Sequence, residues 1–319
     1  MTDATSEGRS LAEAIKERAR ALGFEQCGVT HAGPIERRQA LLDWLARGEH
    51  GAMAYMARDP ERRCDPRTVW PAARTVVVVG MNYYTESDAD AAGPDQAVFA
   101  RYARGDDYHE VVVPRLRELL AFVRARCGEH VEGRAYSDTG PFLERELAWR
   151  AGIGWFGKNT MLIDTRRGSY FVIGLLLLNI DLPPDAPARG GCGTCRRCID
   201  ACPTRAIVEP YRLDARRCLS YLTIESRDPI PDDLAGFVGN RVFGCDICQE
   251  VCPFNRRATP TAEPAFQPRA WTRAPRLQDL MRLDEEQFRA AFRRSPVKRA
   301  RWAGLRRNVA AAMHRQTPG

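Results

Sequence analysis

The residues with the clearest chemical potential are four closely spaced cysteines, Cys192, Cys195, Cys198 and Cys202, followed by Pro203. Their spacing, C-x2-C-x2-C-x3-C-P, is that of bacterial ferredoxins, whose thiolates bind [4Fe–4S] clusters. In ferredoxins with two clusters, the fourth cysteine of the run binds the neighbouring cluster. The run therefore predicts one cluster on its first three cysteines and a second cluster close by.

A second, incomplete copy of the run lies downstream. Cys245, Cys248 and Cys252 repeat the last three cysteines, and Pro253 repeats the proline. We expect Cys218 to supply the missing first ligand. The last cysteine of each half is then expected to bind the cluster of the other half. One predicted ligand set is Cys192, Cys195, Cys198 and Cys252. The other is Cys202, Cys218, Cys245 and Cys248.

Zinc sites and disulfide bonds are the two other common uses of clustered cysteines. C-x2-C pairs also occur in zinc knuckles. Zinc sites use four ligands, however, and rarely place a third cysteine two residues further on or a proline after the last cysteine. Disulfide bonds are disfavoured, because residues 1–7 are polar and lack the apolar stretch of an export signal. The three cysteines outside the sets, Cys27, Cys64 and Cys127, are expected to be small buried apolar residues.

The chain has 319 residues, of which 44% are hydrophobic, so it is long enough for two or three domains with ordinary cores. Its longest apolar run, residues 171–178, is too short to span a bilayer. No twin-arginine leader precedes the first helical pattern. These features predict a cytoplasmic protein that makes no contact with a membrane.

Positive charge is concentrated at the C-terminal end. Residues 255–319 carry 15 Lys and Arg against 5 Asp and Glu, whereas the whole chain has a net charge of only +7. A basic tail on a near-neutral body suggests a polyanionic partner such as a nucleic acid. A solvated helical surface is the alternative. Candidate phosphate contacts are Lys298, Arg299, Arg301, Arg306 and Arg307.

The alternation of strands and helices in the first 185 residues indicates an α/β sandwich. Buried strands are expected at residues 74–80, 131–136 and 169–180, where apolar residues cluster. Helices are expected at residues 11–22, capped by Ser10, and after Pro34. Two more are expected to begin at Pro114 and at Pro141, since proline suits the first helical turn. No G-x-G-x-x-G motif or P-loop is present.

Changes in composition divide the chain into three expected parts. A proline-rich linker at residues 181–187 ends the α/β domain, assigned to residues 1–186. A ferredoxin-like module with two [4Fe–4S] clusters follows at residues 187–258. Residues 259–319 form a short, basic, helical C-terminal segment, in which Asp284 is expected to cap one helix and residues 305–313 to form the last.

A second group of chemically suggestive residues lies at 136–146, YSDTGPFLERE, and continues at 152–160, GIGWFGKNT. An acid, Asp138, comes at the end of an expected strand, where α/β proteins place ligands. The alternative is that Asp138 only caps the following helix.

These stretches resemble the epoxyqueuosine reductase family, as do residues 101–109, 218–221 and 295–299 and the split cysteine set. The likeness covers nearly the whole chain in order. It implies a cobalamin-dependent enzyme with two [4Fe–4S] clusters, which reduces the epoxide of epoxyqueuosine at the wobble position of tRNA to give queuosine. Many members also carry a longer C-terminal helical-repeat domain, which this sequence does not show.

The resemblance also implies roles for individual residues. Asp138 is the implied proton donor to the epoxide oxygen, and residues 1–186 form the cobalamin-binding domain. An external low-potential donor would supply electrons through the clusters, and we expect a monomer. The implied corrin contacts are Arg63, Ala100, Arg101, Asp138, Lys158, Asn159, Thr160, Ser220, Asp246 and Ile247.

Simpler roles remain for some of these residues. Lys158 suits a surface lysine, Asn159 a turn, and His109 a loop histidine rather than a cobalt ligand. Two other functions also stay open: a ferredoxin-like electron carrier with no chemistry of its own, and a reductive dehalogenase. Bound cobalamin would distinguish the carrier from the enzyme, whereas dehalogenases generally carry a twin-arginine leader.

Overall fold

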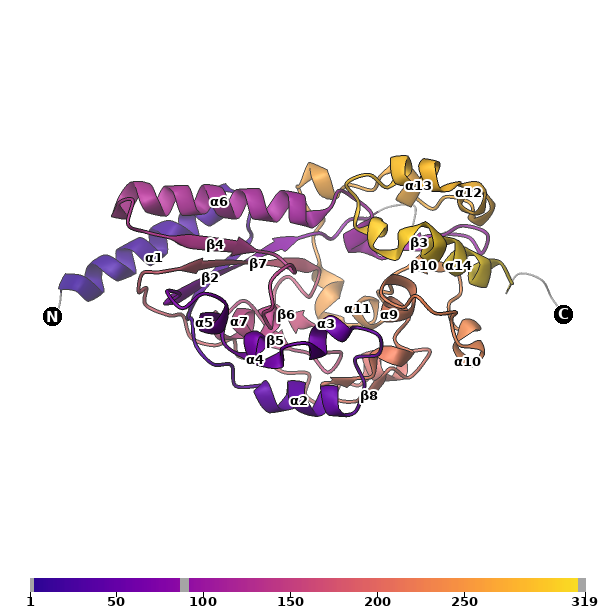
Figure 1. Ribbon diagram of the computed structural model, residues 1–319, viewed down its shortest axis with the longest axis horizontal. Coiled ribbons are helices and arrows are strands. Elements are labelled where there is room, and N and C mark those ends of the chain that lie inside the picture. The colour runs from indigo at the N-terminus through magenta and orange to yellow at the C-terminus, as the bar shows by residue number, and fades with distance from the viewer. Residues whose placement is uncertain (1–2, 87–91, 315–319) are drawn as a thin grey trace.

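A four-stranded antiparallel sheet forms the centre of the N-terminal half (Figure 1). The computed structural model describes residues 3–86 and 92–314. In spatial order the strands are β1 (Gln26–His31), β2 (Thr75–Asn82), β7 (Phe171–Leu178) and β4 (Gly133–Tyr136).

Helices cover both faces of this sheet, as predicted for an α/β sandwich. On one face Val77 and Val79 of β2 pack with the helices α1 (Asp3–Ala21) and α6 (Tyr108–Cys127). On the other face Val76 and Val78 pack with α7 (Glu144–Arg150). Successive side chains of a strand point to opposite faces, so a strand covered on both sides reads as a continuous apolar run.

The three strands expected from apolar runs are confirmed, whereas β1 was not predicted. Two helix starts are wrong. Pro114 lies inside α6, which begins at Tyr108 because Asp107 caps it by accepting the His109 backbone N–H at 3.1 Å. His109 is therefore helical and not in a loop. The helix after Pro141 begins only at Glu144, and its N-cap position is Leu143.

The other N-terminal helix also differs from its predicted start. Ser10 does not cap α1, which already begins at Asp3. The prediction that Gly23 ends this helix agrees with its φ of +86°, a conformation that suits glycine. The remaining short elements of this half are α2 (Arg38–Ala46), α3 (Ala54–Ala57), α4 (Pro60–Cys64), α5 (Pro66–Val69), β3 (Val98–Phe99), η2 (Arg101–Ala103), β5 (Trp155–Phe156) and β6 (Leu162–Ile163).

The cysteine-rich module has two similar halves. In each, a one-turn helix, α8 (Arg197–Asp200) or α11 (Ile247–Glu250), carries the second-last cysteine of the run, Cys198 or Cys248. The helix α9 (Leu219–Ile224) follows Cys218, as predicted. The other elements here are β8 (Ile207–Glu209), β9 (Arg212–Leu213), η3 (Ala215–Arg217), α10 (Asp232–Ala235), β10 (Arg241–Phe243) and η4 (Pro253–Arg257).

The C-terminal helices share a core with both preceding parts. Strand β3 pairs in parallel with β10, and Phe99, Phe243 and Phe292 lie in one buried cluster. The domain boundaries at residues 186 and 258 therefore stay predictions, because a core crosses both. Asp284 caps its helix, accepting from Gln287 N at 2.8 Å. The elements are η5 (Pro264–Phe266), η6 (Ala270–Thr272), α12 (Leu277–Arg282), α13 (Glu285–Ala291), η7 (Pro296–Ala300) and α14 (Arg301–His314).

None of the helices in residues 3–86 and 92–314 combines the length and apolar character needed to cross a membrane.

Candidate active site

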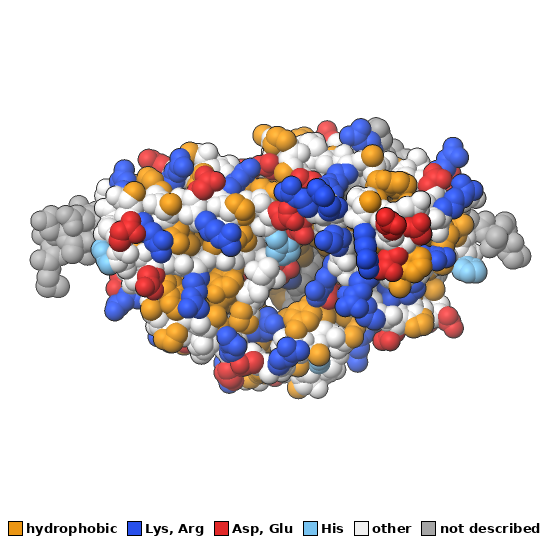
Figure 2. Space-filling view, turned by 45° about the horizontal axis from the view of Figure 1, so that its top comes forward, with side chains coloured by type: hydrophobic (Ala, Val, Ile, Leu, Met, Phe, Trp, Pro, Cys, Tyr) orange, Lys and Arg blue, Asp and Glu red, His pale blue; other side chains and the backbone are white. Residues whose placement is uncertain are grey.

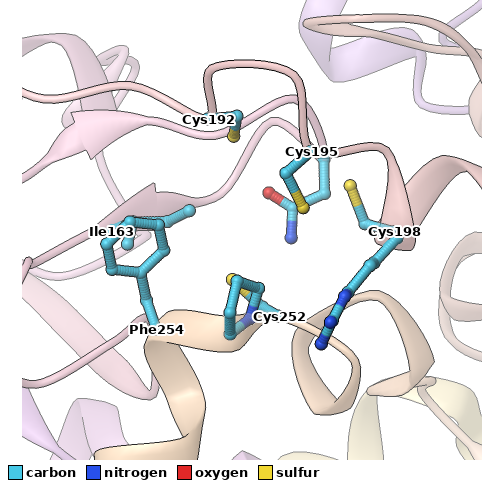
Figure 3. A pocket seen from close by; sticks show the side chains of 9 residues that line it. Ile163, Cys192, Cys195, Cys198, Cys252 and Phe254 are labelled. Atoms are coloured by element: carbon cyan, nitrogen blue, oxygen red, sulfur yellow. The ribbon is translucent and has the colours of Figure 1, made fainter.

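The first predicted cysteine set converges on one pocket. Figure 3 shows Cys192, Cys195, Cys198 and Cys252 around a shared space, into which their side chains point, and all four line the same pocket. The backbone N–H of Lys158 donates to Cys192 Sγ at 3.3 Å. Thiolates gathered from both halves of the module suit one [4Fe–4S] cluster with exchanged fourth ligands.

The second predicted set is also brought together. Burial is the main cause that raises the pKa of Cys245 to about 12, and the charge of Cys218 adds to it. Cys218 and Cys245 likewise raise the pKa of Cys248, after burial, and Cys202 raises that of Cys218. These four thiols are therefore electrostatic neighbours, although Cys218 is distant from the others in sequence.

One loop joins the sheet domain to both cysteine sets. Lys158 Nζ donates to the backbone oxygens of Gly193, at 2.7 Å, and Cys195, at 3.0 Å. Asn159 Nδ2 donates to the backbone oxygen of Cys248 at 3.3 Å. The structure therefore gives both residues roles beyond a surface lysine and a turn former, since they hold the two cysteine loops against the sheet domain.

A buried contact joins the loop before η2 to the start of α11. The backbone N–H of Arg101 donates to Asp246 Oδ2 at 2.7 Å, and burial raises the pKa of Asp246. The Arg101 guanidinium lies over the rings of Tyr84 and Tyr170, at 5.4 and 5.6 Å from their centroids. Of the predicted corrin residues, Arg101 and Asp246 are therefore bonded to each other, with Ala100 and Ile247 adjacent in sequence, whereas Lys158 and Asn159 are bonded to the cysteine loops.

Asp138 is exposed and lies in a left-handed backbone conformation, with φ of +55°. Its Oδ2 accepts a hydrogen bond from the hydroxyl of Tyr108, at the start of α6, at 3.0 Å. Just before it, Ser137 Oγ donates to the backbone oxygen of Ile173 on β7 at 2.7 Å. The helix-cap alternative for Asp138 is wrong, because α7 begins six residues later. Its carboxyl group is therefore available for chemistry.

Two ionisable side chains, Glu144 and Arg63, lie close to Asp138. Glu144 Oε1 accepts the backbone N–H of Asp138 at 2.7 Å. Burial, and then the charge of Asp138, raise the pKa of Glu144 to about 8. Arg63 Nη2 donates to the Tyr55 backbone oxygen at 2.8 Å. Burial lowers the pKa of Arg63, and the charge of nearby Asp138 opposes this lowering.

The raised pKa of Glu144 predicts a pH-dependent difference in stability. The group takes up a proton on folding between its ordinary value of 4.5 and about 8, so wild-type stability should fall as pH rises through that window. Glu144→Gln carries no such proton. The stability advantage of Glu144→Gln over wild type should therefore grow from about pH 5 to pH 8, as measured anaerobically by denaturant unfolding. A pH-independent difference would contradict the shift.

The structure also places two other predicted corrin residues, Ser220 and Thr160. Ser220 is half-buried on α9, beside Tyr221, whose hydroxyl accepts the backbone N–H of Ala52 at 2.6 Å. Gly51 permits this approach, because a Cβ there would lie 2.5 Å from the Tyr221 hydroxyl oxygen and its φ is +58°. Thr160 has φ of +65°, and its backbone oxygen accepts from Arg145 at 2.7 Å.

The basic residues predicted to contact phosphates differ in how they are used. Lys298, Arg301 and Arg306 are exposed. Arg299 pairs with both carboxylate oxygens of Glu225, at 2.9 and 2.8 Å. Arg307 instead donates to the backbone oxygens of Leu222, Ser226 and Asp228, so its guanidinium holds α14 to α9 and to the segment that follows α9. Figure 2 shows a hollow near the middle of one face, with Lys and Arg side chains gathered beside it.

Sequence reasoning assigned no role to Tyr108 or Glu144, the two residues that contact Asp138. Both occur in the stretches that carry the family resemblance, so a signal was present. Their roles depend on contacts between α6, α7 and the loop after β4, which no local pattern reveals.

The α/β domain and its paired cysteine sets define a two-cluster iron–sulfur oxidoreductase. A family model described as "4Fe-4S double cluster binding domain" matches residues 191–255, and one described as "Epoxyqueuosine reductase QueG, DUF1730" matches residues 63–139. An epoxyqueuosine reductase of Cyclobacterium marinum is 41% identical over 92% of this chain and 94% of its own. The chain belongs to the epoxyqueuosine reductase family and is an oxidoreductase of tRNA modification.

Solved structures agree with this assignment. An epoxyqueuosine reductase with an epoxyqueuosine-modified tRNA-Tyr stem loop has a TM-score of 0.90 and 30% identity, covering 96% of this chain and 81% of that one. A Bacillus subtilis epoxyqueuosine reductase, whose catalytic aspartate loop is described as swung out of the active site, has a TM-score of 0.88, 30% identity and coverage of 96% and 82%. Because the chain belongs to this family, we no longer retain the electron-carrier and reductive-dehalogenase alternatives.

Proposed function

We propose that this protein reduces epoxyqueuosine to queuosine at the wobble position of tRNA, with Asp138 as the proton donor. The observation that carries the proposal is the placement of Asp138. Its carboxyl group is exposed beside Arg63 and is oriented by Tyr108, in a fold similar to that of a relative bound to a modified tRNA stem loop. The substrate supports a cytoplasmic location, and a monomer stays a prediction.

The reaction converts an epoxide to an alkene and releases its oxygen as water, which consumes two electrons and two protons. Proton delivery to the departing oxygen requires a positioned acid. The Tyr108 hydroxyl donates to one carboxyl oxygen of Asp138 and so orients the group, and the proton would be delivered from the other oxygen. The electrons come from outside the chain, and we expect an external low-potential donor.

The predicted corrin residues fit cobalamin by their donor chemistry. Cobalamin carries amide side chains on its corrin ring and a phosphate in its nucleotide tail, and both accept hydrogen bonds. Arg63, Thr160 and Ser220 offer guanidinium and hydroxyl donors. Lys158 and Asn159 each carry one N–H more than the hydrogen bonds that they make to the cysteine loops. The backbone at Asp246 and Ile247 lies at the start of α11. When bound, cobalamin supplies low-potential electron chemistry that side chains lack.

We also propose that the basic C-terminal segment holds tRNA through its phosphates. Lys298, Arg301 and Arg306 are the best candidates, because they are exposed. Each lost phosphate contact should reduce the slope of log affinity against log salt by roughly one unit. Arg306→Ala should show this reduction in fluorescence anisotropy titrations at several salt concentrations. Arg117→Ala, an exposed change on α6, is the control, and an equal slope in both variants would count against the contact.

Arg307→Ala is expected to behave differently from Arg306→Ala. Its guanidinium contacts three backbone oxygens within the fold. The change should therefore lower stability and leave the salt slope unaltered.

The proposed function is tested by turnover of the reconstituted protein. Protein loaded anaerobically with iron, sulfide and cobalamin, and given a chemical reductant, should convert epoxyqueuosine in a tRNA anticodon stem loop to queuosine. Nucleoside analysis by mass spectrometry detects the product. Fully loaded protein that leaves the nucleoside unchanged would overturn the proposal.

A further inference from the structure

Asp138 occupies a backbone conformation that an isolated chain disfavours. Its φ of +55° is left-handed, a region that residues other than glycine enter at an energetic cost and usually only where surrounding contacts maintain it. Elsewhere in this loop, Gly140 has no room for a side chain, since a Cβ there would lie 2.4 Å from the Phe142 ring. Some contact must hold the Asp138 peptide itself.

Glu144 makes that contact. It is the first helical residue of α7, and its Oε1 accepts the Asp138 backbone N–H at 2.7 Å. The hydrogen bond spans the loop and ties its tip to the helix that follows. The side chain of Asp138 is held separately, by the Tyr108 hydroxyl of α6. Two helices therefore fix the same residue, one through its backbone and the other through its carboxyl group.

We propose that Glu144 is a positioning residue, which keeps Asp138 in its working conformation by accepting the hydrogen bond of the Asp138 peptide. The inference rests on the proposed function for its catalytic consequence, but the positioning itself concerns only this chain. Glu144 touches neither substrate nor cofactor in this role.

The start of α7 also reaches the loop that contacts both cysteine sets. Arg145 Nη1 donates to the Thr160 backbone oxygen at 2.7 Å, directly beside Lys158 and Asn159. Adjacent residues of one helix thus hold the Asp138 loop and the 157–160 loop at a fixed separation. Glu144 is therefore placed to keep Asp138 at a fixed separation from the 157–160 loop.

The protonation state of Glu144 supports an acceptor role that does not need a negative charge. Burial and the charge of Asp138 raise the pKa of Glu144 to about 8, while the charge of Arg145 opposes the shift. Other ionisable groups close to this loop include Tyr108, Arg63, Tyr55 and Tyr102. A neutral carboxyl group still offers its carbonyl oxygen to an N–H. Glutamine has the same length and keeps such an oxygen, so it is the matched replacement.

The experiment compares Glu144→Ala, Glu144→Gln and the control Glu285→Ala in the holoenzyme. Glu285 is likewise the first helical residue of its helix, α13, but is exposed and lies far from Asp138 in the sequence. Hydrogen exchange of the Asp138 amide is followed by mass spectrometry of overlapping peptides without substrate. Single-turnover conversion of the modified stem loop is measured alongside.

Glu144→Ala should accelerate exchange at Asp138 by roughly tenfold or more, as expected for loss of a hydrogen bond to a carboxyl group. Exchange in the rest of α7 should stay unchanged, which separates this effect from unfolding of the helix. Single turnover should slow in parallel, and Glu144→Gln should restore both properties. Glu285→Ala should alter neither.

Unchanged exchange at Asp138 in Glu144→Ala would overturn the inference, as would a Glu144→Gln variant that behaves like Glu144→Ala. The exchange measurement needs no turnover. If wild-type protein converts no epoxyqueuosine, the proposed function fails while the positioning role is still decided by exchange.

Discussion

Asp138→Asn is expected to lower single-turnover conversion of epoxyqueuosine by roughly a hundredfold or more, the usual effect of losing a general acid. Asparagine is nearly isosteric, and its amide oxygen can still accept the Tyr108 hydrogen bond. It also tolerates the left-handed backbone at this position better than most residues do. The fold, both clusters, cobalamin binding and tRNA binding should therefore be retained.

The rate should be measured with the cobalt already reduced, so that electron supply does not limit it. A retained wild-type rate would remove Asp138 from proton transfer and leave water or another acid as the donor. Normal iron content and normal tRNA affinity in the variant are the controls, because they show that only the chemical step has changed.

Cys218→Ser is expected to remove one cluster and with it turnover driven by an external reductant. Anaerobically reconstituted wild type should contain about eight iron atoms per chain, and the variant about half as many, from the stoichiometry of two [4Fe–4S] clusters. Cys218 is the sharpest test of the ligand sets, because it lies outside both cysteine runs yet is an electrostatic neighbour of Cys202, Cys245 and Cys248.

Cys27→Ser is the matched control. Cys27, expected to be buried, is only partly buried; burial still raises its pKa to about 12, and it lies on β1, outside both sets. The control should keep full iron and sulfide content and an unchanged EPR spectrum after reduction. Full iron content in Cys218→Ser would mean that another residue supplies the fourth ligand.

The parts of the fold that could be predicted are those with a local signal. Strands β2 and β7 are central and covered on both faces, so each reads as an apolar run. Strand β1 was missed because Gln26, Thr30 and His31 break such a run, although its pairing with β2 buries most of it. The start of α6 was misplaced because the Asp107 cap and the packing of the helix outweigh the disruption by Pro114.

The functional site was likewise predictable only where the sequence carries a local signal. The cysteine sets were predictable because ligand spacing reflects cluster geometry directly. The charge pattern indicated a basic tail but could not show that the Arg307 guanidinium turns inward to backbone oxygens. Nor could it show that Glu144 and Tyr108 meet at Asp138, because these contacts join three separate elements.

The most direct test of the central claim is the mass of the modified nucleoside after one turnover. Holoenzyme carrying reduced cobalamin is mixed anaerobically with a stem loop bearing epoxyqueuosine, quenched, digested and analysed. The account predicts that the nucleoside loses one oxygen atom and becomes queuosine in wild type, and keeps that oxygen over the same time in Asp138→Asn. A nucleoside that keeps its oxygen in fully loaded wild-type protein would contradict it.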